Sequence, residues 1–249
     1  MRMRRLWRYA AVPAALAAPL ATSCSRNSST SANEASKHAD APRIRPADFA
    51  GPVDNPYFPL APGSRWVSEG RKAQGNERTV IEVTRDTKTI LGITAVVVHD
   101  TVTKNGNVKE DTFDWYAQDR QGNVWYLGED TKEYANGAVV STKGSWEAGV
   151  NGAQAGIIMK AQPKVGATYR QEYYKGHAED FAQVLSAKES VTVPAGSYRD
   201  VLKTKDFTPL EPKLLEHKYY ARGVGVVQEV TVKGGSGRVQ LVEYTPTTA

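Results

Sequence analysis

The sequence predicts an all-β protein, a single antiparallel meander that forms a curved sheet, half-barrel or sandwich. Short runs of β-branched and aromatic residues follow one another from about residue 65 to residue 244. Turn-forming Gly, Asn and Pro separate these runs at regular spacing. No window of about 12 residues carries the 3.6-residue apolar period of an amphipathic helix. Strands joined by short turns are therefore expected over most of the chain, with at most a short helix near residues 178–185.

Residues 1–23 have the layout of an export signal. A basic start is followed by a charge-free apolar run over residues 9–23, which Pro13 and Pro19 interrupt. This run is too short to cross a bilayer core roughly 30 Å thick. The basic residues are Arg2, Arg4, Arg5 and Arg8. Both the general and the twin-arginine export routes remain open.

Cys24 is the only cysteine and follows this run directly. The segment LATSC at residues 20–24 resembles a bacterial lipobox, in which the cysteine is lipidated. We therefore expect an anchor on the outer face of the cell membrane, or a secreted or periplasmic protein if Cys24 is not lipidated. Residues 24–42 are polar and predict a flexible tether. Residues 43–249 are expected to form a single β-rich domain.

The charge balance argues against a nucleic-acid partner. The chain has 32 basic and 27 acidic residues, but four of the arginines lie in the export signal, which leaves 28 against 27. A nearly neutral domain lacks the electrostatic footprint of a nucleic-acid binder. We expect a monomer without a cofactor, with calcium as a weak possibility.

The strands can be placed in order along the chain. A proline-rich stretch at residues 55–63 predicts an extended arm rather than a helix. Two Asn-Gly pairs, Asn105-Gly106 and Asn136-Gly137, predict tight hairpins, because both central residues of such a turn need positive φ. The expected strands are 65–69, 79–84, 94–102, 109–117, 123–127, 169–174, 181–186, 190–193, 198–204, 217–221, 225–232 and 238–244.

The densest chemistry lies at residues 111–119. Alternation along a strand would place Thr112, Asp114 and Tyr116 on one face and residues 113, 115 and 117 on the other. With the second set toward the core, Asp114 would lie on a polar-aromatic face. Carboxylates beside rings suit sugar recognition, although cross-strand pairs on an ordinary outer face give the same pattern. The candidate ligand contacts are Asp114, Trp115, Tyr126, Trp146 and Glu147.

A carboxylate-dependent hydrolase of envelope glycans is the second hypothesis. It requires two carboxyls roughly 5 to 9.5 Å apart, drawn from Asp114, Glu129, Asp130 and Glu147. Glu129 and Asp130 are also a weak candidate calcium site. Isolated acids such as Glu172, Asp180 and Glu216 are expected to be solvated. No histidine spacing typical of a zinc enzyme and no nucleophile motif is present, so a catalytic role is not favoured.

Residues 144–159 are expected to form a long glycine-rich loop without strands. Its apolar end, Ile157, Ile158 and Met159, is a candidate lid over a cavity, or a plug for an open end of the sheet. The lid would suit a third hypothesis, a carrier of a lipid or other apolar molecule.

Several segments resemble a group of uncharacterised bacterial exported proteins and lipoproteins, over residues 55 to about 230. They are NPYFPL (55–60), FDWYAQD (113–119), GEDTKEY (128–134), GSWEAGV (144–150), VPAGSY (193–198) and EHKYYA (216–221). A looser likeness extends to other periplasmic domains of unknown function. The resemblance implies a curved antiparallel sheet and no particular reaction. The preferred hypothesis is an exported, non-catalytic domain that binds a small-molecule, glycan or lipid ligand.

Overall fold

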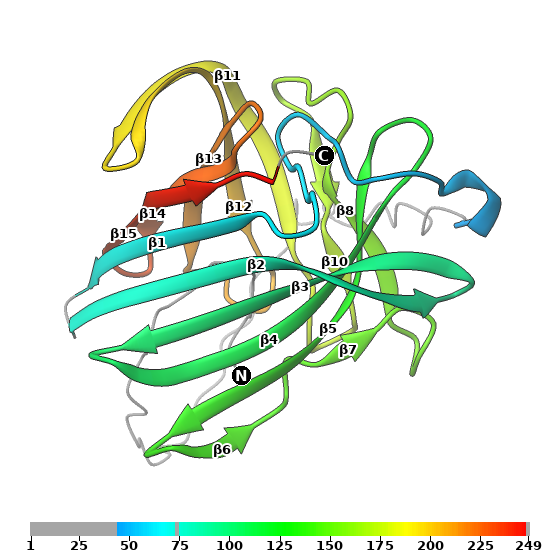
Figure 1. Ribbon diagram of the computed structural model, residues 1–249, viewed down its shortest axis with the longest axis horizontal. Coiled ribbons are helices and arrows are strands. Elements are labelled where there is room, and N and C mark those ends of the chain that lie inside the picture. The colour runs from blue at the N-terminus through cyan, green and yellow to red at the C-terminus, as the bar shows by residue number, and fades with distance from the viewer. Residues whose placement is uncertain (1–43, 73–74, 248–249) are drawn as a thin grey trace, which may run out of the picture.

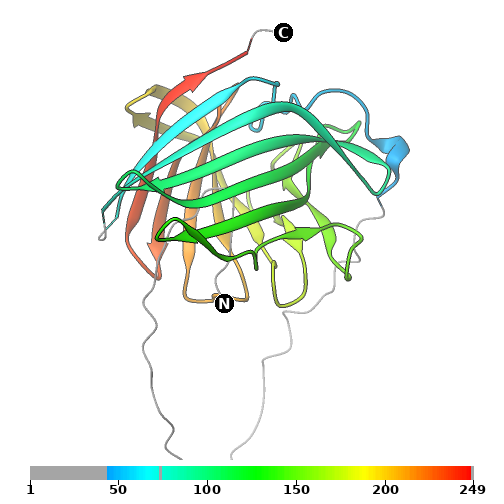
Figure 2. The same cartoon turned by 60° about the horizontal axis from the view of Figure 1, so that its bottom comes forward.

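The computed structural model describes residues 44–72 and 75–247, so the predicted export signal, Cys24 and the tether lie outside the described residues. The described chain forms one antiparallel sheet of 15 strands that is not closed into a barrel (Figure 1). The sheet curls so that its first strands face its later ones across an interior (Figure 2). The predicted fold class is confirmed. No helix among the described residues is long and apolar enough to cross a membrane.

The sheet consists of two consecutive meanders. In the first, β1 to β5 are neighbours in sequence order, and β8 and β10 continue its edge. In the second, β11 to β15 are neighbours, and β9 forms the other edge. The strands of the first meander and its edge are β1 (Arg65–Lys72), β2 (Gly75–Ile90), β3 (Ile93–Lys104), β4 (Asn107–Gln118), β5 (Val124–Ala135), β6 (Ala138–Ser141), β7 (Trp146–Glu147), β8 (Gln154–Met159) and β10 (Glu172–Tyr173). Those of the second are β9 (Thr168–Arg170), β11 (Phe181–Val193), β12 (Gly196–Phe207), β13 (Leu215–Ala221), β14 (Gly225–Lys233) and β15 (Gly237–Thr245).

The first and last strands join the two meanders. β1 pairs antiparallel with β15, from Arg65 opposite Thr245 to Lys72 opposite Gly237. The backbone N–H of Thr247 donates to Oγ of Ser64 at 3.2 Å, so the pairing extends just beyond the strands. The two ends of the sheet domain therefore meet in the middle of the sheet rather than at an edge.

Both predicted Asn-Gly hairpins are present. Asn105 and Gly106 have φ of 50° and 79°, and they join β3 to β4. Asn136 and Gly137 have φ of 52° and 78°, and they join β5 to β6. Positive φ at both positions is what the turn geometry demands.

The expectation of a strand-free loop at residues 144–159 is wrong. This segment contains β7 and β8, and both pair with β5. Ile157 lies opposite Trp125, and Met159 lies opposite Val124 and is fully buried. The predicted lid residues are thus part of the sheet, where pairing with β5 satisfies their backbone, and Ile158 and Met159 are buried.

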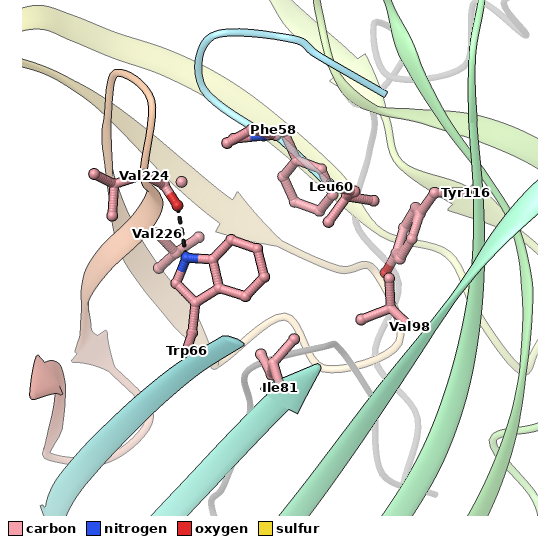
Figure 3. A pocket seen from close by; sticks show the side chains of 10 residues that line it. Phe58, Leu60, Trp66, Ile81, Val98, Tyr116, Val224 and Val226 are labelled. Atoms are coloured by element: carbon pink, nitrogen blue, oxygen red, sulfur yellow. Dashed lines mark hydrogen bonds between the residues drawn. The ribbon is translucent and has the colours of Figure 1, made fainter. Parts of the chain in front are cut away.

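The proline-rich segment is the predicted extended arm. It packs four side chains against the sheet, those of Val53, Tyr57, Phe58 and Leu60. The Leu60 N–H donates to the Val53 carbonyl at 2.9 Å. Beneath the arm lies an apolar cavity of about 30 Å³ (Figure 3). This space holds about one water molecule, far below what a lipid needs. The cavity therefore gives the lipid-carrier hypothesis no support.

The Trp66 side chain closes one wall of this cavity. Its indole N–H donates to the carbonyl of Val224 at 2.7 Å, which links β1 to the turn before β14 (Figure 3). On the opposite wall, the ring of Phe58 packs edge-on against Tyr116 with centroids 5.4 Å apart. The arm is in this way connected to the inner face of β4.

Candidate functional site

The side chains of β4 alternate as predicted, but both faces of the strand are largely covered. Thr112, Asp114 and Tyr116 point into the interior of the curved sheet and are 3%, 0% and 0% exposed. Trp115, on the opposite face, is 7% exposed. The condition that residues 113, 115 and 117 face the core is therefore not met, because the curvature of the sheet makes the Asp114 face the inside.

Asp114 and Tyr126 are direct partners. The Tyr126 hydroxyl donates to Oδ1 of Asp114 at 2.6 Å. A register shift between Trp115 and Tyr116 places Tyr116 opposite Tyr126, and the two rings stack with centroids 4.9 Å apart. β4 and β5 thus hold the carboxyl and the two phenols in one environment.

Trp146 on β7 completes this group. Its ring meets Tyr126 edge-on, with centroids 5.2 Å apart and an interplanar angle of 84°. Gly128 on β5 makes the close approach of β7 feasible, because a Cβ at this position would overlap the Trp146 carbonyl oxygen. We refer to Asp114, Tyr116, Tyr126 and Trp146 as the Asp114 cluster.

Burial sets the electrostatics of the cluster. Desolvation raises the pKa of Asp114 well above its usual value, against the opposing effect of the Tyr126 hydrogen bond. Desolvation, with the nearby charge of Asp114, likewise raises the pKa of Asp100 on β3. The pKa values of Tyr116 and Tyr126 are also raised, first by burial and then by Asp114. Both phenols therefore remain protonated, and Tyr126 is the donor in its bond with Asp114.

Four buried polar atoms around the cluster have no hydrogen-bond partner among the described residues. They are Oδ2 of Asp114, Oδ1 of Asp100, the hydroxyl of Tyr116 and the indole nitrogen of Trp146. Most buried polar groups in folded proteins are hydrogen-bonded, and a group that is not carries a desolvation penalty of about 1–3 kcal/mol. This concentration of unpartnered atoms makes the Asp114 cluster the strongest candidate site among the described residues.

The interior beyond the cluster is strongly acidic. The described chain buries nine carboxyl side chains and one lysine, counted among residues that are less than a tenth exposed. The acids are Glu77, Asp100, Asp114, Glu129, Glu172, Asp180, Asp206, Glu216 and Glu229, and the lysine is Lys218. The expectation that Glu172, Asp180 and Glu216 are solvated is wrong, since none of the three is more than 3% exposed.

The predicted ligand contacts divide between two faces of the sheet. Asp114, Tyr126 and Trp146 come together on the inside, as described above. On the outside, Nζ of Lys88 lies 3.3 Å from the centroid of the Trp115 ring and 2.7 Å from Oε2 of Glu147. Trp115 and Glu147 therefore belong to a second group, the Lys88 group, formed by Lys88, Trp115 and Glu147.

The predicted calcium pair is separated in the same way. Glu129 is buried on the inner face opposite Asp114. The side chain of Asp130 is 50% exposed and lies 3.7 Å from Nζ of Lys132. Adjacent residues of a strand point to opposite faces, so Glu129 and Asp130 cannot hold one ion together. Within the described ranges, no group of three or more His, Cys, Asp or Glu is arranged to hold a metal.

Asp100 is the member of this region that the sequence analysis missed. It lies opposite Thr112 while Asp114 lies opposite Val98, so the two acids are diagonal neighbours across β3 and β4. The signal was available in the sequence, since Asp100 occupies the same face as Val98 and Val102 in a strand of β-branched residues.

No protein-family model matches the sequence, and no curated protein matches it. Among solved structures, a Bacteroides fragilis protein described as exported and as having a YmcC-like fold is similar, with 17% identity and a TM-score of 0.47 over 76% of this chain and 99% of its own. A Parabacteroides distasonis protein described as a lipoprotein has 16% identity and a TM-score of 0.42 over 76% and 98%.

Proposed function

We propose that this protein is an exported, lipid-anchored, non-catalytic domain that binds a ligand on the inner face of its curved sheet. The observation that carries the proposal is the Asp114 cluster, where a carboxyl, two phenols and an indole share one environment and leave polar atoms without partners. Export and anchoring rest on the apolar run of residues 9–23 and on Cys24.

Binding is tested by thermal unfolding of the protein against a panel of neutral, cationic and anionic oligosaccharides. A ligand at about a hundredfold over its Kd stabilises a protein by about 2.7 kcal/mol. For a domain of this size that corresponds to roughly 5–11 °C. We expect at least one oligosaccharide to produce such a shift.

Two variants locate the site. Asp114→Asn changes the inner face, and Glu147→Gln changes the Lys88 group on the outer face. We expect Asp114→Asn to reduce the ligand-induced shift and Glu147→Gln to leave it as in the wild type. The reverse pattern would move the site to the outer face and end this proposal.

Anchoring is tested separately. Cells that express the full chain with a labelled fatty acid should incorporate label into the wild type and not into Cys24→Ser. The unlabelled variant should be recovered from the soluble exported fraction. Label that persists in Cys24→Ser would show that Cys24 is not the anchor.

One arrangement favours hydrolysis as a second candidate function. Asp114 and Glu129 lie directly opposite each other on β4 and β5, both facing inward. Two such carboxyls, one with a raised pKa, are the equipment of a glycosidase. Release of reducing sugar from an oligosaccharide that binds, abolished in both Asp114→Asn and Glu129→Gln, would replace the binding proposal by this one.

A further inference from the structure

The buried charges of the two halves of the sheet are balanced differently. On β12–β14, Nζ of Lys218 lies 3.7 Å from Oδ2 of Asp206 and 3.7 Å from Oε2 of Glu229. On β3 and β4, no lysine, arginine or histidine of the described residues forms an ion pair with Asp100 or Asp114. Among the described residues, no cation therefore balances Asp100 and Asp114 in the way that Lys218 balances Asp206 and Glu229.

The positions of the two acids define a receptor for a positive group. As diagonal neighbours on adjacent strands, Asp100 and Asp114 have Cα atoms roughly 7–8 Å apart. Each has one buried carboxyl oxygen without a partner in the described part of the chain. A single ammonium group between them could donate to both, because an ammonium offers three N–H donors.

Two further buried atoms without a partner among the described residues, the Tyr116 hydroxyl and the Trp146 indole nitrogen, indicate what else the ligand carries. The Tyr116 hydroxyl is one of these buried atoms, and its ring stacks on Tyr126, which donates to Asp114. The indole N–H of Trp146 can only donate, and it needs an acceptor such as a ligand hydroxyl. A ligand that satisfies both carboxyls and the indole N–H carries a positive charge and, beside it, an uncharged hydrogen-bond acceptor. The described residues show no three-ligand arrangement for a metal, so an organic cation fits the set better.

We propose that the Asp114 cluster, together with Asp100, binds an organic cation in which an ammonium group is carried on a hydroxyl-bearing frame, as in an amino sugar. This inference rests on the proposed ligand-binding function and specifies the ligand of that same site. The ammonium lies between Asp100 and Asp114, and a neighbouring hydroxyl accepts from Trp146.

Binding of such a cation is coupled to proton release. Without the ligand, the interior favours the protonated form of both carboxyls, because their charged forms are desolvated and repel each other. The cation favours the carboxylates, and the protons leave to the buffer. A neutral sugar at the same place would release none.

The test uses the intact protein with a short glucosamine oligosaccharide and its fully N-acetylated counterpart. The two probes differ in whether each amine can carry a proton. Titration calorimetry is run at about pH 6.5, below the pKa of ~7.7–8.0 of a peptide α-amino group, in two buffers of different ionisation enthalpy. We expect the glucosamine probe to bind at least tenfold more tightly and to release protons, which the buffer dependence of the heat reports.

Three variants assign the effect. Asp100→Asn and Asp114→Asn should each weaken binding of the glucosamine probe tenfold or more and reduce the proton release. Glu147→Gln, on the outer face, should bind as the wild type does. Because Asn nearly matches Asp in shape, near-ultraviolet circular dichroism should confirm that both inner-face variants remain folded.

The outcomes separate this inference from the proposed function. Equal or tighter binding of the N-acetylated probe, lost in Asp114→Asn, overturns the cation and leaves ligand binding at the site intact. Binding of the glucosamine probe without proton release, or unchanged in both inner-face variants, also overturns it. If neither probe binds at about 1 mM, the cation inference fails, and the wider oligosaccharide panel decides the proposed function.

Discussion

Tyr126 donates a 2.6 Å hydrogen bond to Asp114 from the neighbouring strand, and neither side chain is more than 3% exposed. The phenol thereby satisfies one carboxyl oxygen, while the other has no partner among the described residues. The fold holds Oδ1 of Asp114 in a hydrogen bond, and Oδ2 can still form one with a ligand. The predictions below follow from this division and from the packing around it.

Replacing Asp114 with Asn should stabilise the protein without a ligand. The amide oxygen can still accept from Tyr126, and folding no longer requires a group that is ionised in the unfolded chain at pH 7 to take up a proton or lose its hydration. We expect the free energy of unfolding at pH 7 to rise by on the order of 1 kcal/mol, measured by urea unfolding. Tyr126→Phe is the contrasting variant and should lower it by about 1–3 kcal/mol, because it leaves Oδ1 of Asp114 without its donor. A decrease of equal size in Asp114→Asn would contradict the prediction.

Stability should depend on pH through Asp100 and Asp114. Their folded pKa values are raised, so above about pH 3.9 the folded state binds more protons than the unfolded state. Their contribution is then complete below the unfolded pKa and is lost as the pH rises through the folded pKa. Glu110 and Asp111 on β4 strengthen this effect, since their charges also raise the pKa of Asp100.

The measurement compares the wild type with the double variant Asp100→Asn/Asp114→Asn from about pH 4 to pH 8. Other carboxyls titrate in both proteins, so the difference between the two isolates this pair. We expect the stability advantage of the double variant to grow with pH. A difference that stays constant would mean that the two groups titrate normally in the folded state.

Gly128→Ala should displace β7. Gly128 has φ of 136°, and a Cβ there would overlap the Trp146 carbonyl oxygen. We expect a loss on the order of 3 kcal/mol and a changed near-ultraviolet signal from Trp146. Gly235→Ala is the control, because its Cβ would meet only Cγ2 of Thr231 at 3.6 Å. If both variants unfold alike, the close approach of β7 does not set the stability.

Lys218→Met should be among the most damaging substitutions in the second meander. The lysine is 3% exposed and is shared by Asp206 and Glu229. Removing one partner of a buried ion pair costs about 3–5 kcal/mol. Lys233→Met, at an exposed site on β14, should change stability by less than about 0.5 kcal/mol. Adding Glu229→Gln to Lys218→Met should recover part of the loss.

The sequence was sufficient for the fold class and the hairpins because both depend on local chemistry. Asn105-Gly106 and Asn136-Gly137 carry their turn geometry with them, and alternation along β4 is a property of any strand. The sequence also predicts that Asp114 and Tyr126 lie close together, because a hairpin joins their strands.

Local sequence patterns do not indicate which face of each strand points into the interior. The curvature that encloses Asp114 depends on strands that are far away in the sequence, such as β12 and β13. The same tertiary arrangement places Trp115 and Glu147 on the outer face. It also buries carboxyl side chains that would be solvated on an isolated strand. β7 and β8 were missed because glycine-rich segments have low strand propensity, and only pairing with β5 makes them strands.

The meeting of β1 and β15 in the middle of the sheet has a consequence for how the protein reaches its native state. The partners of Arg65 to Lys72 are residues 237–245, so β1 and β14 each present an open edge until β15 has been synthesised. Such edges are templates for association with other chains. A chain truncated before residue 237 should therefore accumulate as aggregates rather than as a smaller folded protein. Pairing of β1 with β15 also closes a loop that contains most of the domain. We therefore expect slow folding, during which a chaperone would have to protect the open edges.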